Sequence, residues 1–282
     1  MTDPGCLRIE APEAAAREVV ADRCWALGAT AVGETDVGLE VGFPTDDEAR
    51  DAAAALVAWR PDVGVQVVDA GPGLAAALEA WRPFARPVRV GALHVRPAWL
   101  DPDDDPPAVG ERVVVVDPTR AFGYDHPSTV ACLEAVAELA GPGVAVLDVG
   151  CGSGVLALGA AALGAAPVVA VDADPVAVAA TAASASAAGL GVDASTRPVG
   201  ELTGRFDLVV ANIGAAALRA LAPAIAARVA PGGRLVLAGL LVEQVPEVAL
   251  TYEAEGLALI GVGERGGWAS PSFLGKSTFS GA

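Results

Sequence analysis

The chain has 282 residues, of which 53% are hydrophobic, and a formal net charge of −17. This length suits one large or two modest domains, and so acidic a balance argues against nucleic-acid binding. It favours a basic partner through long-range steering, although solubility alone also explains it. The N-terminus lacks the order of a signal peptide, and the uncharged stretch at 149–171 is Ala/Gly-rich and contains Pro167. We therefore expect a cytoplasmic protein without a membrane span.

Four cysteines and two histidines leave little material for a metal centre. The cysteines form neither a CxxC pair nor a zinc-type spacing. We expect no metal site, and the free thiols suit a reducing compartment.

Residues 7–70 predict a small α+β domain. Strand, helix, two strands, helix and strand follow one another at 7–10, 12–29, 31–34, 37–41, 45–60 and 63–69. Thr45, with Glu48 three residues on, is a capping box for the second helix. The βαββαβ order is that of the ferredoxin-like split unit. It contains no acid–base pair or phosphate loop, so we expect this domain, 1–72, to hold a substrate or to be purely structural.

A linker region, 73–108, is expected next. It holds a short helix ending in Trp81 and one alternating strand at 87–97. The run DPDDDPP at 101–107 is typical of a solvated turn or linker. A strand, a loop and a helix follow at 111–118, 119–129 and 129–140.

From Val144 onward, the expected order begins with strand, helix, strand, helix, two strands, helix and strand. Strands are expected at 144–149, 167–172, 192–199, 206–212, 233–240 and 257–263. Helices are expected at 154–164, 175–188, 214–230 and 242–255. The uniformly apolar strands imply burial on both faces, as in a parallel sheet. The segment 267–276 is expected to add an antiparallel edge strand, which completes an α/β domain over 109–282.

The run VLDVGCGSG at 146–154 is the most informative stretch of the chain. An apolar strand breaks at Gly150, Gly152 and Gly154, and a helix-forming run follows. A strand that stops at a glycine turn and opens a helix is where α/β enzymes bind nucleotide-like cofactors. Gly152, Gly154 and Ala157 also fit the dinucleotide pattern G-x-G-x-x-A, so this loop alone does not exclude NAD.

Three polar residues at strand ends narrow the choice of cofactor. Asp148 lies inside the first strand, where it either orders the glycine loop or faces a ligand ammonium through water. Asp172 ends the next strand and can accept both ribose hydroxyls; helix capping is the other role, for which Asp174 is better placed. Asn212 ends the strand FDLVVAN, where it either faces a methyl donor and its acceptor or caps the strand.

Together these features resemble the S-adenosylmethionine-dependent methyltransferase fold. The longer series AFGYDHPST, VLDVGCGSG, VDADP and ANI, with a late Trp268, resembles the methyltransferases that modify large-subunit ribosomal protein eleven (PrmA-type). The similarity covers most of the chain. It implies a Rossmann-like, seven-stranded methyltransferase domain preceded by a small ferredoxin-like domain for substrate recognition.

The resemblance also assigns site residues. It implies cofactor contacts at Thr129, Gly150, Asp172 and Asn212. It implies that Phe122, Gly123 and His126 shape the roof of the pocket. The loop here is one residue shorter than the family's usual AFGTGTHPTT, and Tyr124-Asp125 replaces small residues. We expect that bulk near the entry of the acceptor amine, where it would alter the substrate more than the reaction.

Methyl transfer is an in-line displacement in which the protein supplies mainly alignment and desolvation. The accepting amine must be neutral to attack. We expect the Asn212 side chain or the backbone carbonyls of 212–214 to orient it. His126 is either a proton acceptor or a cap of the following helix.

The sequence therefore predicts a monomeric, cytoplasmic S-adenosylmethionine-dependent protein N-methyltransferase. Its acceptors would be lysine or N-terminal amines of a basic ribosomal protein. One alternative is a small-molecule methyltransferase, prompted by the altered loop. The other is a non-catalytic cofactor-binding module, against which the intact glycines, Asp172 and Asn212 argue.

Overall fold

The computed structural model consists of two compact units, Met1–Ala85 and Arg86–Ala282. The described residues are 5–11, 17, 19–21, 23–24, 27–29, 31–35, 37–43, 45–69, 85–116 and 123–276. The expected helix ending at Trp81 lies outside them. No helix in this described part of the chain has the length and hydropathy that a membrane crossing needs.

The first unit contains a four-stranded antiparallel sheet in the order β2-β3-β1-β4. The strands are β1 (Gly5–Glu10), β2 (Ala31–Thr35), β3 (Gly38–Phe43) and β4 (Gly64–Asp69). Alternate residues of β1 and β3, among them Leu7 and Val41, are buried in a core that also receives Leu56 from helix α2 (Asp46–Trp59). The predicted cap of this helix is confirmed, because the Thr45 hydroxyl accepts the Glu48 N–H at 3.2 Å.

The second unit is an α/β fold around a mixed sheet of eight strands. Five parallel strands lie in the order β10-β9-β8-β11-β12, and β15 follows antiparallel, with β13 and β14 paired to it. They are β8 (Val146–Val149), β9 (Val168–Val171), β10 (Asp193–Ser195), β11 (Phe206–Asn212), β12 (Val229–Ala238), β13 (Leu240–Leu241), β14 (Leu257–Arg265) and β15 (Trp268–Gly275). The carboxyl ends of the parallel strands meet at one edge of the sheet.

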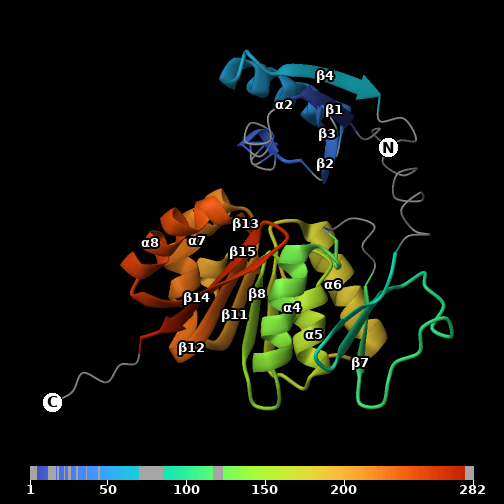
Figure 1. Cartoon of the computed structure of the whole chain (residues 1–282), viewed down its shortest axis with the longest axis vertical. Helices are drawn as coiled ribbons and strands as arrows, with labels where there is room; N and C mark the ends of the chain where they lie inside the picture. The colour runs from blue at the N-terminus through green and yellow to red at the C-terminus, as the bar shows by residue number, and fades with distance from the viewer. Residues whose placement is uncertain are drawn as a thin grey trace. The chain divides into compact units, whose positions relative to one another are not determined.

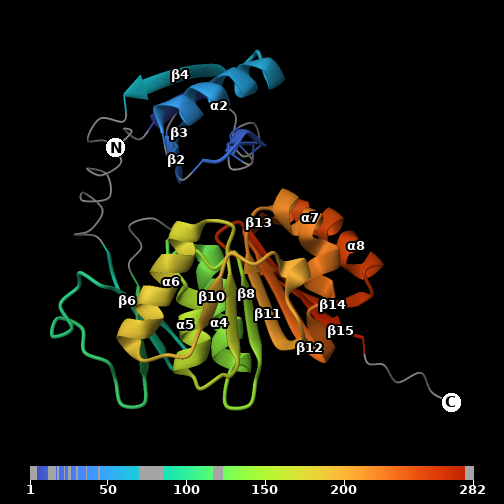
Figure 2. The same ribbon diagram turned by 180° about the vertical axis from the view of Figure 1, so that it is seen from behind.

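Helices cover both faces of this sheet. They are α4 (Pro127–Leu139), α5 (Val155–Ala162), α6 (Pro175–Ala188), α7 (Ala215–Ala226) and α8 (Val245–Ala254). Figures 1 and 2 agree that α4, α5 and α6 lie on one side and α7 and α8 on the other. Tyr252 and Phe273 pack with ring centroids 5.4 Å apart in the core beneath α7 and α8. The 3-10 turns η3 (Val199–Glu201) and η4 (Val242–Gln244) complete the crossovers.

The single strand predicted at 87–97 is wrong. The segment forms two antiparallel strands, β5 (Val88–Val90) and β6 (Leu93–Pro97), because Gly91 turns the chain with φ +56°. β6 pairs in parallel with β7 (Arg112–Val116), and the three strands pack against α4, α5 and α6. Gly159 of α5 allows this approach, since a Cβ there would lie 3.2 Å from a methyl carbon of Leu93. These strands therefore belong to the second unit.

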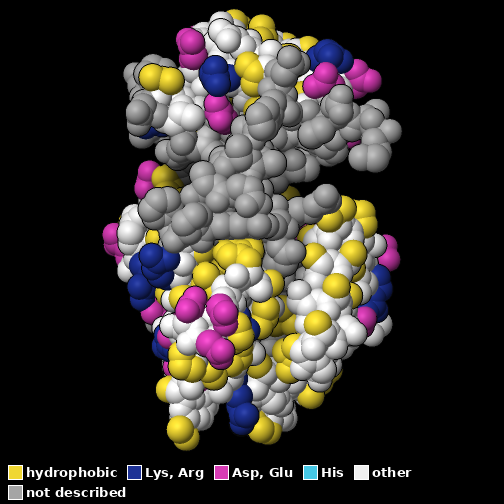
Figure 3. Space-filling view, turned by 90° about the vertical axis from the view of Figure 1, so that its right-hand side faces the viewer, with side chains coloured by type: hydrophobic (Ala, Val, Ile, Leu, Met, Phe, Trp, Pro, Cys, Tyr) yellow, Lys and Arg dark blue, Asp and Glu magenta, His cyan; other side chains and the backbone are white. Residues whose placement is uncertain are grey.

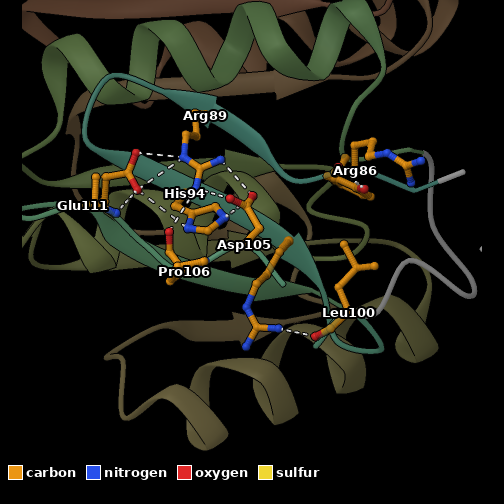
Figure 4. A network of polar contacts seen from close by, with 10 residues as sticks. Arg86, Arg89, His94, Leu100, Asp105, Pro106 and Glu111 are labelled. Carbon is orange, nitrogen blue, oxygen red and sulfur yellow. Dashed lines mark hydrogen bonds and ion pairs between the residues drawn. The ribbon is translucent and has the colours of Figure 1, made fainter. Parts of the chain in front are cut away.

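A polar network holds the acidic loop between β6 and β7 (Figure 4). The Arg89 guanidinium donates to both carboxylate oxygens of Asp105, at 2.7 and 2.8 Å, and to Glu111 at 3.1 Å. The buried His94 ring lies between these carboxylates, 3.5 Å from Asp105 and 3.8 Å from Glu111. Charge-assisted bidentate bonds of this kind fix geometry, so the loop is not a free linker.

Other acids of the same loop are left in solvent. Asp101, Asp103 and Asp104 are exposed. Figure 3 shows acidic side chains gathered on the face of the second unit that this loop occupies in Figure 1.

Arg89→Ala tests whether the network orders the loop. Glu111 also accepts the Ala108 N–H at 2.7 Å, so loss of the guanidinium frees both carboxylates and this turn. We expect hydrogen exchange of residues 103–111 to become about five- to tenfold faster, since a charge-assisted bond is lost. Arg197→Ala, which removes a guanidinium bound to Asp193 and Ser195 on β10, is the matched control. Unchanged exchange in the Arg89 variant would refute the role.

Candidate functional site

The glycine loop joins β8 to α5 at the carboxyl edge of the sheet. Gly150, Gly152 and Gly154 have φ of +75°, +53° and +79°, the left-handed region that favours glycine. The N–H groups of Gly150 and Cys151 both donate to the Val171 carbonyl, which ties the loop to the end of β9. A Cβ on Gly150 would lie 2.3 Å from a methyl carbon of Ile213, beyond the end of β11. The loop therefore packs backbone-first against its neighbours, as the glycine pattern predicts.

Asp172 follows β9 and points to the loop. Its Oδ2 accepts the Gly152 N–H at 2.9 Å, and its Oδ1 accepts the Asp174 N–H at 2.9 Å. Each carboxylate oxygen retains a lone pair for another donor. Asp174, rather than Asp172, caps α6, since its Oδ1 accepts the Val176 N–H at 2.8 Å, which confirms the prediction for this cap.

Asp148 is fully buried in β8. One oxygen accepts the Ala157 N–H at 3.1 Å from the first turn of α5, while Oδ1 is buried without a hydrogen-bond partner. The pKa of Asp148 is raised to about 7, because burial raises it strongly and the nearby Asp172 carboxylate adds to this, while the hydrogen bond from Ala157 partly offsets both. The carboxyl group therefore anchors α5 to the strand, and its unpartnered oxygen has hydrogen-bonding capacity in reserve.

Asn212 and Thr129 meet across the site. The Asn212 amide nitrogen donates to the Thr129 hydroxyl at 3.0 Å, which joins the end of β11 to the first turn of α4. This bond turns the amide so that Oδ1 keeps its acceptor capacity. Beside it, Gly239 has φ +79°, and a Cβ there would approach Oδ1 to 3.2 Å and the Ile213 carbonyl oxygen to 2.8 Å. A side chain at residue 239 would therefore crowd these two oxygens, and glycine avoids this.

His126 is the N-cap of α4. Its Nδ1 accepts the Ser128 N–H at 3.3 Å and lies 2.8 Å from the Ser128 hydroxyl. Its ring meets Trp268 edge-on, with centroids 4.7 Å apart. Burial lowers the pKa of His126, so the neutral ring is favoured. This geometry is that of a helix cap, one of the two roles that the sequence left open.

The loop before α4 is described only from Gly123 onward, and Phe122 lies outside the described residues. Tyr124 corrects an expectation. Its side chain is fully buried, its hydroxyl donates to the Arg86 carbonyl at 2.6 Å, and burial raises its pKa to about 12. The tyrosine therefore packs into the second unit rather than adding bulk at an open entry.

Sequence reasoning missed Thr181. This α6 residue is buried, and its hydroxyl donates to the Gly152 carbonyl at 3.2 Å. The signal was a β-branched hydroxyl residue within the alanine-rich run PVAVAATAASASAA, where alanine is the better helix former.

The fold and this site define a class. A mixed sheet whose glycine loop faces a fixed carboxylate from the next strand is the arrangement of Rossmann-like nucleotide-binding enzymes. A solved structure of "ribosomal protein L11 methylase" from Lactobacillus delbrueckii subsp. bulgaricus is similar, with TM-score 0.59 and 26% identity. The match covers 67% of this chain and 95% of that one. The second unit is therefore an α/β methyltransferase fold.

The profile of the ribosomal protein L11 methyltransferase (PrmA) family matches residues 75–274, and the chain belongs to this family. The Geobacter metallireducens ribosomal protein L11 methyltransferase is 37% identical over 237 residues, 80% of this chain and 78% of that protein. The Geobacter sulfurreducens protein of the same name is 41% identical over 184 residues. That match spans 64% of this chain and 60% of the relative, less than two thirds of its length.

The raised pKa of Asp148 predicts a pH dependence of stability. In the unfolded chain an aspartate releases its proton near pH ~4, whereas the folded chain keeps it to about 7. The free energy of unfolding of the ligand-free protein should therefore fall as pH rises between these values. The Asp148→Asn variant has no carboxyl group to titrate, so it does not lose stability in this way. Its free energy of unfolding minus that of the wild type should therefore rise by about 2 kcal/mol from pH 5 to pH 8.

Urea unfolding at both pH values measures this difference. Any destabilisation by the amide that does not depend on pH cancels when the results at pH 5 and pH 8 are subtracted. Asp193→Asn, on the exposed end of β10, is the control for loss of one carboxylate. A constant difference between Asp148→Asn and wild type across this range would show that the buried carboxyl is already ionised at pH 5.

Proposed function

We propose that the protein is an S-adenosylmethionine-dependent N-methyltransferase whose substrate is ribosomal protein L11. Membership of the family and the names of its relatives support the substrate class. The observation that carries the proposal is the glycine loop whose Gly152 N–H is bound by Asp172. This reading includes lysine or N-terminal amines of L11 as acceptors, a monomer, and action in the cytoplasm.

The residues present fit a sulfonium nucleoside. The Asp172 carboxylate, held by two backbone N–H groups, retains lone pairs for two ribose hydroxyls. Asp148 lies one strand away with a buried, unpartnered oxygen, so a cation near the loop would relieve the cost of its ionisation. The pyrophosphate of NAD would instead add negative charge near the buried Asp148 and raise the cost of its ionisation, whereas Asp172 suits the ribose of either cofactor.

When bound, S-adenosylmethionine supplies an electrophilic methyl group. The chain's own residues have to orient a neutral amine toward it and exclude water. Asn212 Oδ1 and the Ile213 carbonyl suit the first task, because both accept hydrogen bonds and Gly239 places no side chain against them. An amine whose N–H groups are held by such acceptors keeps its lone pair free for the methyl carbon.

The contacts of His126 suit a residue that lines the site better than one that accepts a proton. Its Nδ1 is occupied by the Ser128 backbone, so the neutral ring carries its proton on Nε2. With Trp268 at its edge, it would help to exclude water near the start of α4. Thr129, Gly150, Gly154 and Gly123 complete the proposed cofactor site, with Phe122 as a further proposed roof residue.

The first unit is proposed as the substrate-recognition domain. The sheet order β2-β3-β1-β4, with α2 between β3 and β4, is compatible with a ferredoxin-like domain. In the second unit, seven strands would form the methyltransferase sheet and the two-residue β13 would be an addition. The net charge of −17 favours encounter with a basic protein through long-range steering.

The proposal is tested by transfer of a labelled methyl group. Purified protein and labelled S-adenosylmethionine are incubated with ribosomal proteins and, separately, with a metabolite extract. Label in L11 is the expected result. Label only in the extract would support the small-molecule alternative, and binding of S-adenosylmethionine without label in either pool would support a non-catalytic module. Calorimetric titration with S-adenosylmethionine and with NAD distinguishes an S-adenosylmethionine-binding protein from a dehydrogenase.

Asn212→Ala should uncouple binding from turnover. Loss of Oδ1 removes the proposed amine acceptor but leaves Asp172 and the glycine loop intact. We expect kcat for L11 methylation to fall about 10–100-fold, as for a misplaced reactant, while the Kd for S-adenosylmethionine changes less than kcat. Glu253→Gln, at an exposed position of α8, is the control for surface effects. Wild-type turnover and cofactor affinity in the Asn212 variant would remove this residue from the mechanism.

A further inference from the structure

We infer that Thr181 is a positioning residue. By binding the Gly152 carbonyl, it holds the glycine loop in place and so sets the affinity of the site for S-adenosylmethionine. The inference rests on the proposed function. It concerns a buried hydroxyl on α6, a helix to which none of the other proposed site residues belongs.

Gly152 is held by a side chain at each of its two backbone polar groups. Its N–H donates to Asp172 Oδ2 at 2.9 Å, and its carbonyl accepts from the Thr181 hydroxyl at 3.2 Å. A glycine at φ +53° has wide conformational freedom, so its two flanking peptides rotate unless they are bonded. The Asp172 bond fixes one peptide and the Thr181 bond fixes the other.

The hydroxyl has a defined direction. Cys151 Sγ lies 3.5 Å from Thr181 Oγ1, and burial raises the pKa of this thiol to about 12, so it stays protonated and can donate. The single proton of the threonine is then used toward the Gly152 carbonyl. A short chain of donors therefore runs from Cys151 through Thr181 to Gly152.

Packing shows that threonine is matched to this place. Only Thr181 and Ala185 of α6 are buried, so the helix approaches the loop with small side chains. A Cβ on Gly154 would lie 2.7 Å from the threonine methyl carbon and hydroxyl oxygen. The methyl group fills the space under Gly154 while the hydroxyl reaches Gly152, and burying that hydroxyl is favourable only with a partner.

The consequence reaches the cofactor through Asp172. Without the Thr181 bond the peptide between Gly152 and Ser153 can rotate about ψ of Gly152, and the Gly152 N–H is then held in place by Asp172 alone. The carboxylate keeps this donor on a less rigid backbone, which weakens the orientation proposed to receive the ribose. This chain of contacts predicts an effect on affinity rather than on the chemical step.

Thr181→Val removes the hydroxyl and keeps the size, the methyl group and the β-branched helix propensity. We expect the Kd for S-adenosylmethionine to rise about fivefold, the loss of one hydrogen bond, with kcat at saturating cofactor within about twofold of wild type. Hydrogen exchange of residues 150–156 in the ligand-free protein should become faster. Thr181→Ser, which retains the hydroxyl, should restore the Kd to near the wild-type value.

The matched control is Thr251→Val, which removes a hydroxyl that donates to the Glu247 carbonyl within α8. It should leave the Kd unchanged. Thr181→Ala, with higher helix propensity, replaces the valine variant if that one does not fold. An unchanged Kd in Thr181→Val, an equal loss in Thr181→Ser, or a fall in kcat at constant Kd would overturn the inference alone. Absence of binding by the wild-type protein would overturn the proposed function as well.

Discussion

The contact between the glycine loop and the strand ends on either side of it is the constraint on which the site depends. Gly150 leaves no room for a side chain against Ile213, and two N–H groups of the loop bind the Val171 carbonyl. The ends of β8, β9 and β11 therefore hold one another in place. Asp148, Asp172 and Asn212 lie in this cluster, and Thr129 is bonded to it, so this part of the proposed site is preorganised by backbone packing and by the bonds that hold these side chains.

Two carboxylates of different character lie in that frame. Asp148 is buried, has a raised pKa and retains an unpartnered oxygen, whereas Asp172 is fixed by backbone donors and partly open. This combination favours a ligand that carries positive charge next to a sugar. A pyrophosphate would add negative charge beside the buried Asp148 and raise the cost of its ionisation, so this loop, which nominally fits a dinucleotide pattern, is better suited to a nucleoside without phosphates.

Much of this arrangement could be predicted from the sequence because it depends on local chemistry. Three glycines after an apolar strand, an acid at the end of the next strand and an aspartate before Pro175 each have few structural solutions. Contacts between distant segments gave no such signal. The burial of Tyr124 against Arg86, the clamp of Arg89 on Asp105, and the bond from Thr181 to Gly152 all join residues 16 to 38 positions apart. Residues 87–97 are predicted as one strand because their hydrophobic and polar side chains alternate. The turn at Gly91, which separates β5 from β6, rests on this single residue.

The most direct measurement of the central claim is a crystal structure of the chain with S-adenosylmethionine. The account predicts both ribose hydroxyls within about 3 Å of Asp172, the Gly152 N–H still bound to that carboxylate, and the methyl group facing Asn212. A nucleoside bound away from residues 150–154, or a loop rearranged so that Gly152 no longer contacts Asp172, would contradict it.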